Sequence, residues 1–129
     1  SSAASDVYKR QLCGDNVHIY LKLNENNKVE DISFEGNGCA ITMASASIMT
    51  DLVKGKEEKE VKEIVTDFLD MIKEKDELST QLLNEDEKTK LMCLSGVKQY
   101  PMRVKCATLS WHTLTSAMNN SQEIASTED

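Results

Sequence analysis

The sequence predicts an α+β domain in which a small antiparallel sheet packs against several helices. Two observations carry this prediction. An alternation of apolar and polar residues followed by a turn cluster indicates a β-hairpin early in the chain, and helical apolar periodicity follows it. Strands therefore come first and helices second, an order typical of α+β folds. The length of 129 residues fits one such domain.

The predicted hairpin occupies the segment 17–34. Apolar and polar residues alternate over 17–23, which is the period-two pattern of a half-buried strand. A cluster of Asn and Glu at 24–27 predicts a turn, after which 28–34 returns as the second strand. In that second strand Val29 falls on the face opposite Ile32, so we expect a bulge or strong twist there.

Helical patterns dominate the rest of the chain. The apolar stretch 39–42 is interpreted as a short strand, and 43–53 as a helix. The clearest helix is predicted over 61–72, where apolar residues recur at i, i+3, i+4 and i+7. The charged segment 75–90 is expected to be a loop or short helix, and a last helix is predicted after Pro101.

Both ends of the chain are polar. We interpret residues 1–11 as a tail that is either non-native or disordered, because they lack periodicity and resemble translated sequencing-adapter sequence. The domain itself is expected to span 12–118, and 119–129 is interpreted as a second polar tail.

The charge of the chain argues against two classes of partner. Fifteen basic residues against 22 acidic ones give a net charge of −7. Nucleic-acid binding relies on Lys and Arg to neutralise phosphates, and anionic membrane surfaces also attract basic residues, so we expect neither partner. No apolar run approaches the roughly 20 residues that span a bilayer, and no secretory signal pattern opens the sequence. We therefore expect a cytoplasmic location.

Four cysteines without a secretory context favour metal-binding or reactive thiols over disulfides. Cys13 precedes a glycine, Cys39 follows Gly-x-Gly, and Cys106 is placed by the pattern in the first turn of the last helix. Glycines allow close backbone approach, and helix N-termini stabilise thiolates. For each cysteine the alternative is packing as a small hydrophobe, and this is the interpretation we favour for Cys93.

Three motifs taken together resemble the U-type iron–sulfur cluster assembly family, which includes the IscU/NifU-like scaffolds and the SufU branch. They are Cys-Gly-Asp before the hairpin, Phe-Glu-Gly-Asn-Gly-Cys-Ala-Ile at 34–41, and Arg-Val-Lys-Cys-Ala-Thr-Leu-Ser-Trp at 103–111. The resemblance covers 12–118. It implies a three-stranded antiparallel sheet with helices packed on it and one metal site at an exposed end. The implied ligands are Cys13, Asp15, Cys39 and Cys106.

The resemblance is closest to the SufU branch. Lys105 stands where IscU scaffolds carry a His, and their Leu-Pro-Pro-Val-Lys motif does not occur here. This branch implies a zinc-dependent sulfur acceptor that takes persulfide sulfur from a SufS-type cysteine desulfurase and serves a downstream SUF scaffold or apo-proteins. The alternative is a scaffold on which a transient 2Fe–2S cluster is assembled and passed to apo-proteins, and a purely structural zinc module is the third possibility.

The proposed ligands suit either metal. Three thiolates and one carboxylate fit a tetrahedral Zn²⁺ centre, or an iron site with one harder ligand. Their negative charge exceeds that of Zn²⁺, so Arg103 beside Cys106 is a candidate for electrostatic support, with a solvated surface cation as the alternative. Cys13 is the expected persulfide acceptor, because Gly14 gives its backbone the freedom that a departing ligand needs.

Overall fold

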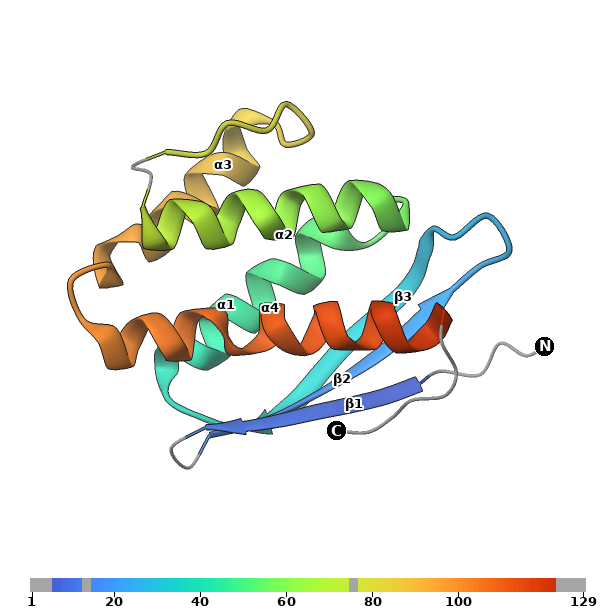
Figure 1. Cartoon of the computed structure of the whole chain (residues 1–129), viewed down its shortest axis with the longest axis horizontal. Helices are drawn as coiled ribbons and strands as arrows, with labels where there is room; N and C mark the ends of the chain where they lie inside the picture. Colours follow the sequence, from blue (N-terminus) through green and yellow to red (C-terminus); the bar gives the residue numbers. More distant parts are fainter. Residues whose placement is uncertain (1–5, 13–14, 75–76, 123–129) are drawn as a thin grey trace.

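The computed structural model describes residues 6–12, 15–74 and 77–122. Its strands pair in the order β1-β2-β3, with both pairs antiparallel. Helices α1 and α4 pack on one face of this sheet, α2 packs on α4, and α3 lies in the outermost layer (Figure 1). The elements are β1 (Asp6–Leu12), β2 (Asp15–Leu23), β3 (Val29–Asn37), α1 (Ala40–Val53), α2 (Glu58–Lys73), α3 (Glu85–Met92), the 3₁₀ helix η1 (Cys93–Val97) and α4 (Pro101–Gln122).

The predicted α+β class and the predicted hairpin are confirmed. Strands β2 and β3 pair antiparallel, and the side chain of Asn24 accepts hydrogen bonds from backbone N–H groups within the turn. The pairing register shifts between Lys22 and Leu23, which is the expected bulge. Because of this shift, Val29 and Ile32 are both buried.

The third strand of the sheet comes from a different segment than the sequence predicted. Residues assigned to a tail at 1–11 include most of β1, which pairs with β2 from Asp6↔Leu21 to Leu12↔Asp15. Conversely, the stretch 39–42 is not a strand, because α1 begins at Ala40. Four apolar or small residues cannot distinguish a buried strand from the first turn of a helix by periodicity alone.

The helices agree more closely with the sequence. The helix predicted over 61–72 is α2, which extends one turn further at its N-terminus, and the helix after Pro101 is α4. The charged segment 75–90 contributes the start of the short helix α3. Helix α4 continues to Gln122, so the first four residues of the predicted polar tail at 119–129 are helical, and the rest lie outside the described residues. Among the described residues, no helix is both long and apolar enough to cross a membrane.

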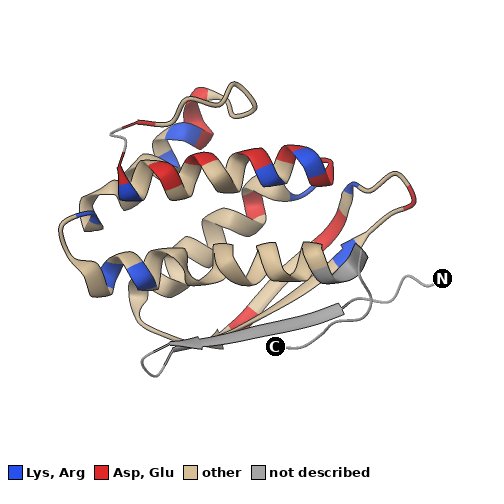
Figure 2. Ribbon diagram, viewed as in Figure 1, with Lys and Arg blue, Asp and Glu red and all other residues tan. Residues whose placement is uncertain are grey.

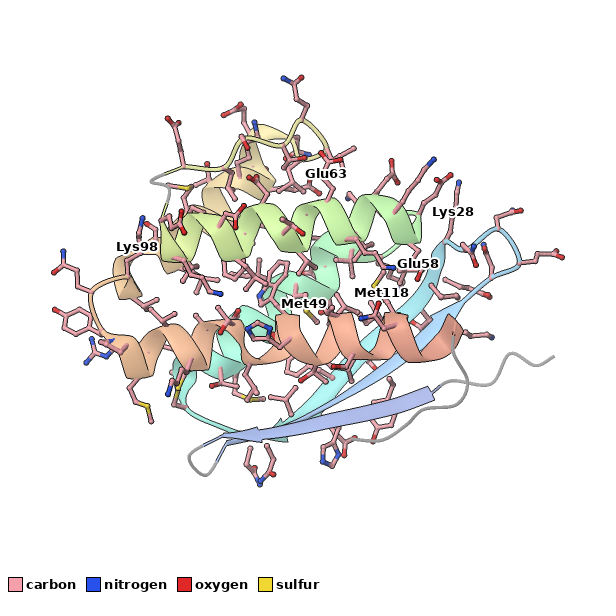
Figure 3. The ribbon with its side chains drawn as sticks, in the orientation of Figure 1. Lys28, Met49, Glu58, Glu63, Lys98 and Met118 are labelled. Carbon is pink, nitrogen blue, oxygen red and sulfur yellow. The ribbon has the colours of Figure 1, made fainter. Side chains whose placement is uncertain are left out.

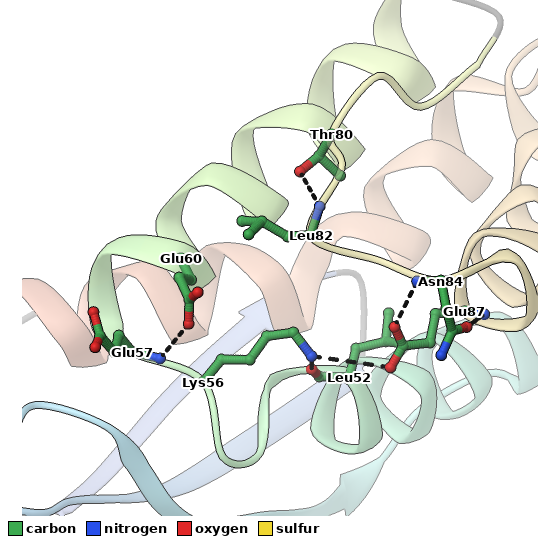
Figure 4. Close-up of polar contacts among 8 residues, drawn as sticks. All are labelled: Leu52, Lys56, Glu57, Glu60, Thr80, Leu82, Asn84 and Glu87. Carbon is green, nitrogen blue, oxygen red and sulfur yellow. Dashed lines mark hydrogen bonds and ion pairs between the residues drawn. The ribbon is translucent and has the colours of Figure 1, made fainter.

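Polar side chains fix where α2 and α3 begin (Figure 4). Helix α2 opens with a capping box between Glu57 and Glu60, and α3 opens with a capping box between Asn84 and Glu87. Such reciprocal bonds satisfy backbone N–H groups that have no partner within the helix. The ammonium of Lys56 binds a carbonyl at the end of α1 at 2.7 Å and lies 3.9 Å from the Glu87 carboxylate. Lys56 thereby links α3 to the end of α1.

The core extends from the sheet to α1 and α4, and from these helices to α2. Phe68 of α2 stacks on Trp111 of α4, with ring centroids 4.3 Å apart. Met49 and Met118 are fully buried among the side chains between the helices (Figure 3). With few aromatic residues in the chain, aliphatic and Met side chains fill most of this space.

One hydroxyl joins the two helices that lie on the sheet. Ser45 of α1 is fully buried, and its Oγ donates to the carbonyl oxygen of Ala107 in α4 at 2.5 Å. The same Oγ accepts the indole N–H of Trp111 at 2.9 Å. A serine therefore satisfies the polar atom of the largest core side chain while allowing α1 and α4 to approach closely.

We expect Ser45→Ala to lower the free energy of unfolding by about 1–3 kcal/mol, because it leaves the Trp111 indole N–H buried without a partner. Ser47→Ala is the matched control on the same helix, since Ser47 is exposed. Urea unfolding of both variants checks this expectation. Equal stability of the two variants would contradict the role of Ser45.

Candidate metal centre

The thiols of Cys39 and Cys106 come within hydrogen-bonding range of each other, although the two residues lie far apart in the sequence. Cys39 is exposed and Cys106 is half-buried. Two of the four predicted metal ligands are therefore brought together by the tertiary structure, at an end of the molecule that solvent reaches.

Cys39 owes its position to the end of β3 and the start of α1. It is the N-cap residue of α1, with extended backbone angles, and its carbonyl accepts the N–H of Met43 at 3.1 Å. Gly36 allows β3 to approach β2 closely just before it. Gly36 has a φ of 145°, and a Cβ at this position would lie 2.0 Å from the Asn16 carbonyl oxygen. A glycine is thus required at position 36 for the close approach of β3 to β2.

The surroundings of Cys39 favour its thiolate. Partial burial raises the pKa of this thiol, but hydrogen bonds from the Thr42 side chain and backbone, from Cys106 and from the Ile41 backbone outweigh that effect. The pKa of Cys39 therefore lies below its ordinary value. The two backbone donors are N–H groups of the first turn of α1, a position at which the helix offers no carbonyl acceptor of its own and the helix dipole favours negative charge.

The sequence assigned this helix N-terminal setting to the wrong cysteine. Helix α4 begins at Pro101, so Cys106 lies in its second turn and not in its first. The position of Cys106 is set instead by the packing of α4 on α1, since the next residue, Ala107, is the one that Ser45 binds.

The other two predicted ligands are less fully described. Cys13 lies outside the described residues, and only the backbone of Asp15 is described, at the first position of β2. The neighbouring residue Asn16 pairs with Asn37, two residues before Cys39, so the backbone of Asp15 lies at the same end of the sheet as Cys39. Within the described part of the chain, no three Cys, His, Asp or Glu side chains gather closely enough to hold a metal.

Arg103, predicted to give electrostatic support, is exposed in the first turn of α4. Its guanidinium lies over the Tyr100 ring, 4.6 Å from the centroid. This is a cation–π contact at the surface, one turn before Cys106.

Cys93, which we expected to pack as a small hydrophobe, is instead exposed, at the start of η1.

Two hydroxyl residues at this end were not identified from the sequence. Thr42 is fully buried, and its Oγ1 lies 3.5 Å from the Cys39 sulfur. Ser110 is fully buried one turn after Cys106. The signal was present in the spacing, because a residue three or four positions after a helical cysteine shares its face of the helix.

The proximity of Cys39 and Cys106 predicts that metal-free protein binds phenylarsine oxide, a reagent that bridges two neighbouring thiols. The test uses a Cys13→Ser background, in which only Cys39, Cys93 and Cys106 remain. There, Cys39→Ser or Cys106→Ser should abolish the bridged adduct in intact-mass spectra, whereas Cys93→Ser should retain it. An adduct that depends on Cys93 would contradict the observed arrangement.

Comparisons with known proteins show which family the chain belongs to. The family model described as the NifU-like N-terminal domain matches residues 2–107. The chain is 42% identical over 102 residues to the zinc-dependent sulfurtransferase SufU of Bacillus subtilis, covering 79% of this chain and 65% of that protein. It is 39% identical over 109 residues to the iron–sulfur cluster assembly scaffold protein IscU of Streptococcus pyogenes, covering 84% of this chain and 65% of that protein. The chain thus spans slightly less than two thirds of these relatives.

A solved structure is also similar. It is the crystal structure of a putative iron–sulfur cluster assembly scaffold protein for the SUF system from Fervidobacterium islandicum. It matches with a TM-score of 0.73 and 33% identity, over 90% of this chain and 81% of that one. The matching family model, the similar sequences and the shared fold lead to one conclusion: this chain belongs to the NifU-like N-terminal domain family.

Proposed function

We propose that this protein is a zinc-binding sulfur acceptor in iron–sulfur cluster assembly and takes persulfide sulfur from a SufS-type cysteine desulfurase. The observation that carries the proposal is that the thiols of Cys39 and Cys106 lie within hydrogen-bonding range of each other at an exposed end of the fold. The similarity to a protein named as a zinc-dependent sulfurtransferase supports the choice of metal and activity.

The described residues fit a zinc site. Cys39 and Cys106 provide two soft sulfur ligands, and the conditions around Cys39 already favour the thiolate that metal binding requires. We propose Cys13 and Asp15 as the remaining ligands, to complete a four-coordinate set. When bound, Zn²⁺ would keep the cysteine ligands deprotonated at neutral pH.

The proposed chemistry is a thiol exchange at Cys13. Its thiolate attacks the terminal sulfur of the desulfurase persulfide, and the bond between the two persulfide sulfurs breaks. The desulfurase cysteine leaves as a thiolate, and Cys13 retains the terminal sulfur as its own persulfide. No external oxidant or reductant is needed, because one sulfur–sulfur bond replaces another.

The surface beside the two thiols suits a protein partner. Tyr100 and Met102 are the exposed large hydrophobic residues of the described chain, at 49% and 47%. From 88 to 122 the sequence contains basic residues but no Asp or Glu, in a chain with net charge −7. Figure 2 shows basic residues without acidic ones at the end of η1 and the start of α4, whereas α2 carries acidic residues interspersed with Lys. We infer that the desulfurase presents an acidic, partly apolar surface here.

A second function uses the same residues. Two relatives, from Streptococcus pyogenes and Thermotoga maritima, are named as iron–sulfur cluster assembly scaffold proteins, at 39% and 37% identity. Thiolates also bind iron, so a 2Fe–2S cluster assembled on the same ligands is the competing proposal.

The zinc proposal predicts about one tightly bound zinc per chain in protein purified without added metal. Cys39→Ser and Cys106→Ser should each lower both zinc content and thermal stability, because metal binding is coupled to folding. Cys93→Ser is the matched control and should change neither. Metal analysis and thermal unfolding with and without chelator check this. Unchanged stability of wild type in chelator, together with full zinc content in both ligand variants, would contradict the site.

The sulfur-acceptor proposal predicts that Cys13→Ser keeps its fold but fails to stimulate a cognate cysteine desulfurase. After wild-type protein reacts with desulfurase and cysteine, non-reducing peptide mass mapping should place the extra sulfur on the Cys13 peptide. Extra sulfur on Cys93 or Cys106, with Cys13 unmodified, would refute the relay. A coloured 2Fe–2S product that transfers intact to an apo-ferredoxin would favour the scaffold function instead.

A further inference from the structure

Ser110 carries a buried hydroxyl with no partner. Its side chain is fully buried in α4, and among the described residues its Oγ is the only buried side-chain oxygen or nitrogen without a hydrogen bond. Burying an unpaired hydroxyl disfavours folding, and native proteins rarely do so without a compensating role.

Three threonine hydroxyls of α4 form hydrogen bonds to the backbone of their own helix. Thr108, Thr113 and Thr115 each donate to the carbonyl oxygen four residues earlier, at 2.9, 2.9 and 3.0 Å. Ser110 could form the equivalent bond to the carbonyl of Cys106, but does not. Its hydroxyl is therefore left available to another acceptor.

That acceptor can be identified from helix geometry. Ser110 is one turn after Cys106, so the two side chains lie on the same face of α4, with Cβ atoms about 6 Å apart. Helical side chains also lean toward the N-terminus, which directs Ser110 toward Cys106.

Cys39, the cysteine that lies beside Cys106, is also followed by a buried hydroxyl residue. Cys39 has a buried threonine, Thr42, three residues later in α1, and the Thr42 hydroxyl lies 3.5 Å from the Cys39 sulfur. Each of the two neighbouring thiols is thus followed, within one helical turn, by a fully buried hydroxyl residue. The Thr42 hydroxyl is in contact with a cysteine sulfur, whereas the Ser110 hydroxyl forms no hydrogen bond within the described part of the chain.

We propose that Ser110 is a positioning residue of the metal centre, whose hydroxyl donates a hydrogen bond to the Cys106 sulfur when that sulfur is a metal-bound thiolate. A thiol is a weak acceptor, whereas an ionised sulfur is a much stronger one. The bond would restrain the Cys106 side chain and withdraw electron density from a ligand set that carries more negative charge than the metal. This inference rests on the proposed metal site.

The test compares Ser110→Ala with Thr113→Val, which removes a buried hydroxyl that does have a partner. In metal-free protein, Ser110→Ala should leave the urea midpoint unchanged or higher, whereas Thr113→Val should lower it. Zinc affinity, measured by competition with a chromophoric chelator, should fall about 10-fold in Ser110→Ala and stay at the wild-type value in Thr113→Val.

Cobalt(II) substitution gives a spectroscopic readout that packing alone would not change. Loss of a hydrogen bond to the thiolate raises the energy of its sulfur electrons, so the sulfur-to-cobalt charge-transfer band of Ser110→Ala should move to longer wavelength. Wild-type zinc affinity and an unmoved band in Ser110→Ala would overturn the role of Ser110 and leave the metal site intact. A wild-type protein that bound neither zinc nor cobalt would refute the metal site itself, and the role of Ser110 with it.

Discussion

The close packing of α1 on α4 is the constraint on which the rest of the structure depends. At its centre the Ser45 hydroxyl binds both a carbonyl and an indole N–H of α4. A small residue at this position lets the two helix backbones approach, while its hydroxyl satisfies the polar atom of Trp111. The first of these partners, Ala107, directly follows Cys106. The contact that stabilises the core therefore also determines where one candidate ligand meets the other.

The two cysteines reach this point with different local support. Cys39 stands at a helix N-terminus, after a glycine that allows β3 to lie against β2, and it has backbone and hydroxyl donors around its sulfur. Cys106 lies within a helix whose backbone N–H groups are already used. Hydrogen bonds to its thiolate must therefore come from side chains. The unpaired hydroxyl of Ser110, one turn further along α4, is the donor that we propose for this role.

Charge differs between the outer helices and the segment that carries Cys106. Acidic residues lie along α2 and at the start of α3, where several Lys residues accompany them (Figure 2). The segment that carries Cys106 has basic residues and exposed apolar side chains instead. This distribution keeps the overall charge of the protein negative and reserves a cationic, partly apolar surface for the end at which sulfur chemistry is proposed.

The sequence by itself determined the class of fold, the hairpin with its bulge, the helices at 61–72 and after Pro101, and the family. These features depend on local periodicity and short motifs, which a linear sequence displays directly. It could not determine that residues 6–12 form β1, because a strand with irregular patterning is defined by its pairing with β2. It also placed Cys106 in a first helical turn and missed the setting of Cys39, because the four residues from 39 to 42 are too few to show a period. The meeting of Cys39 with Cys106, and the burial of Thr42 and Ser110 beside them, were decided only by tertiary packing, since each joins or covers residues from separate elements of the chain.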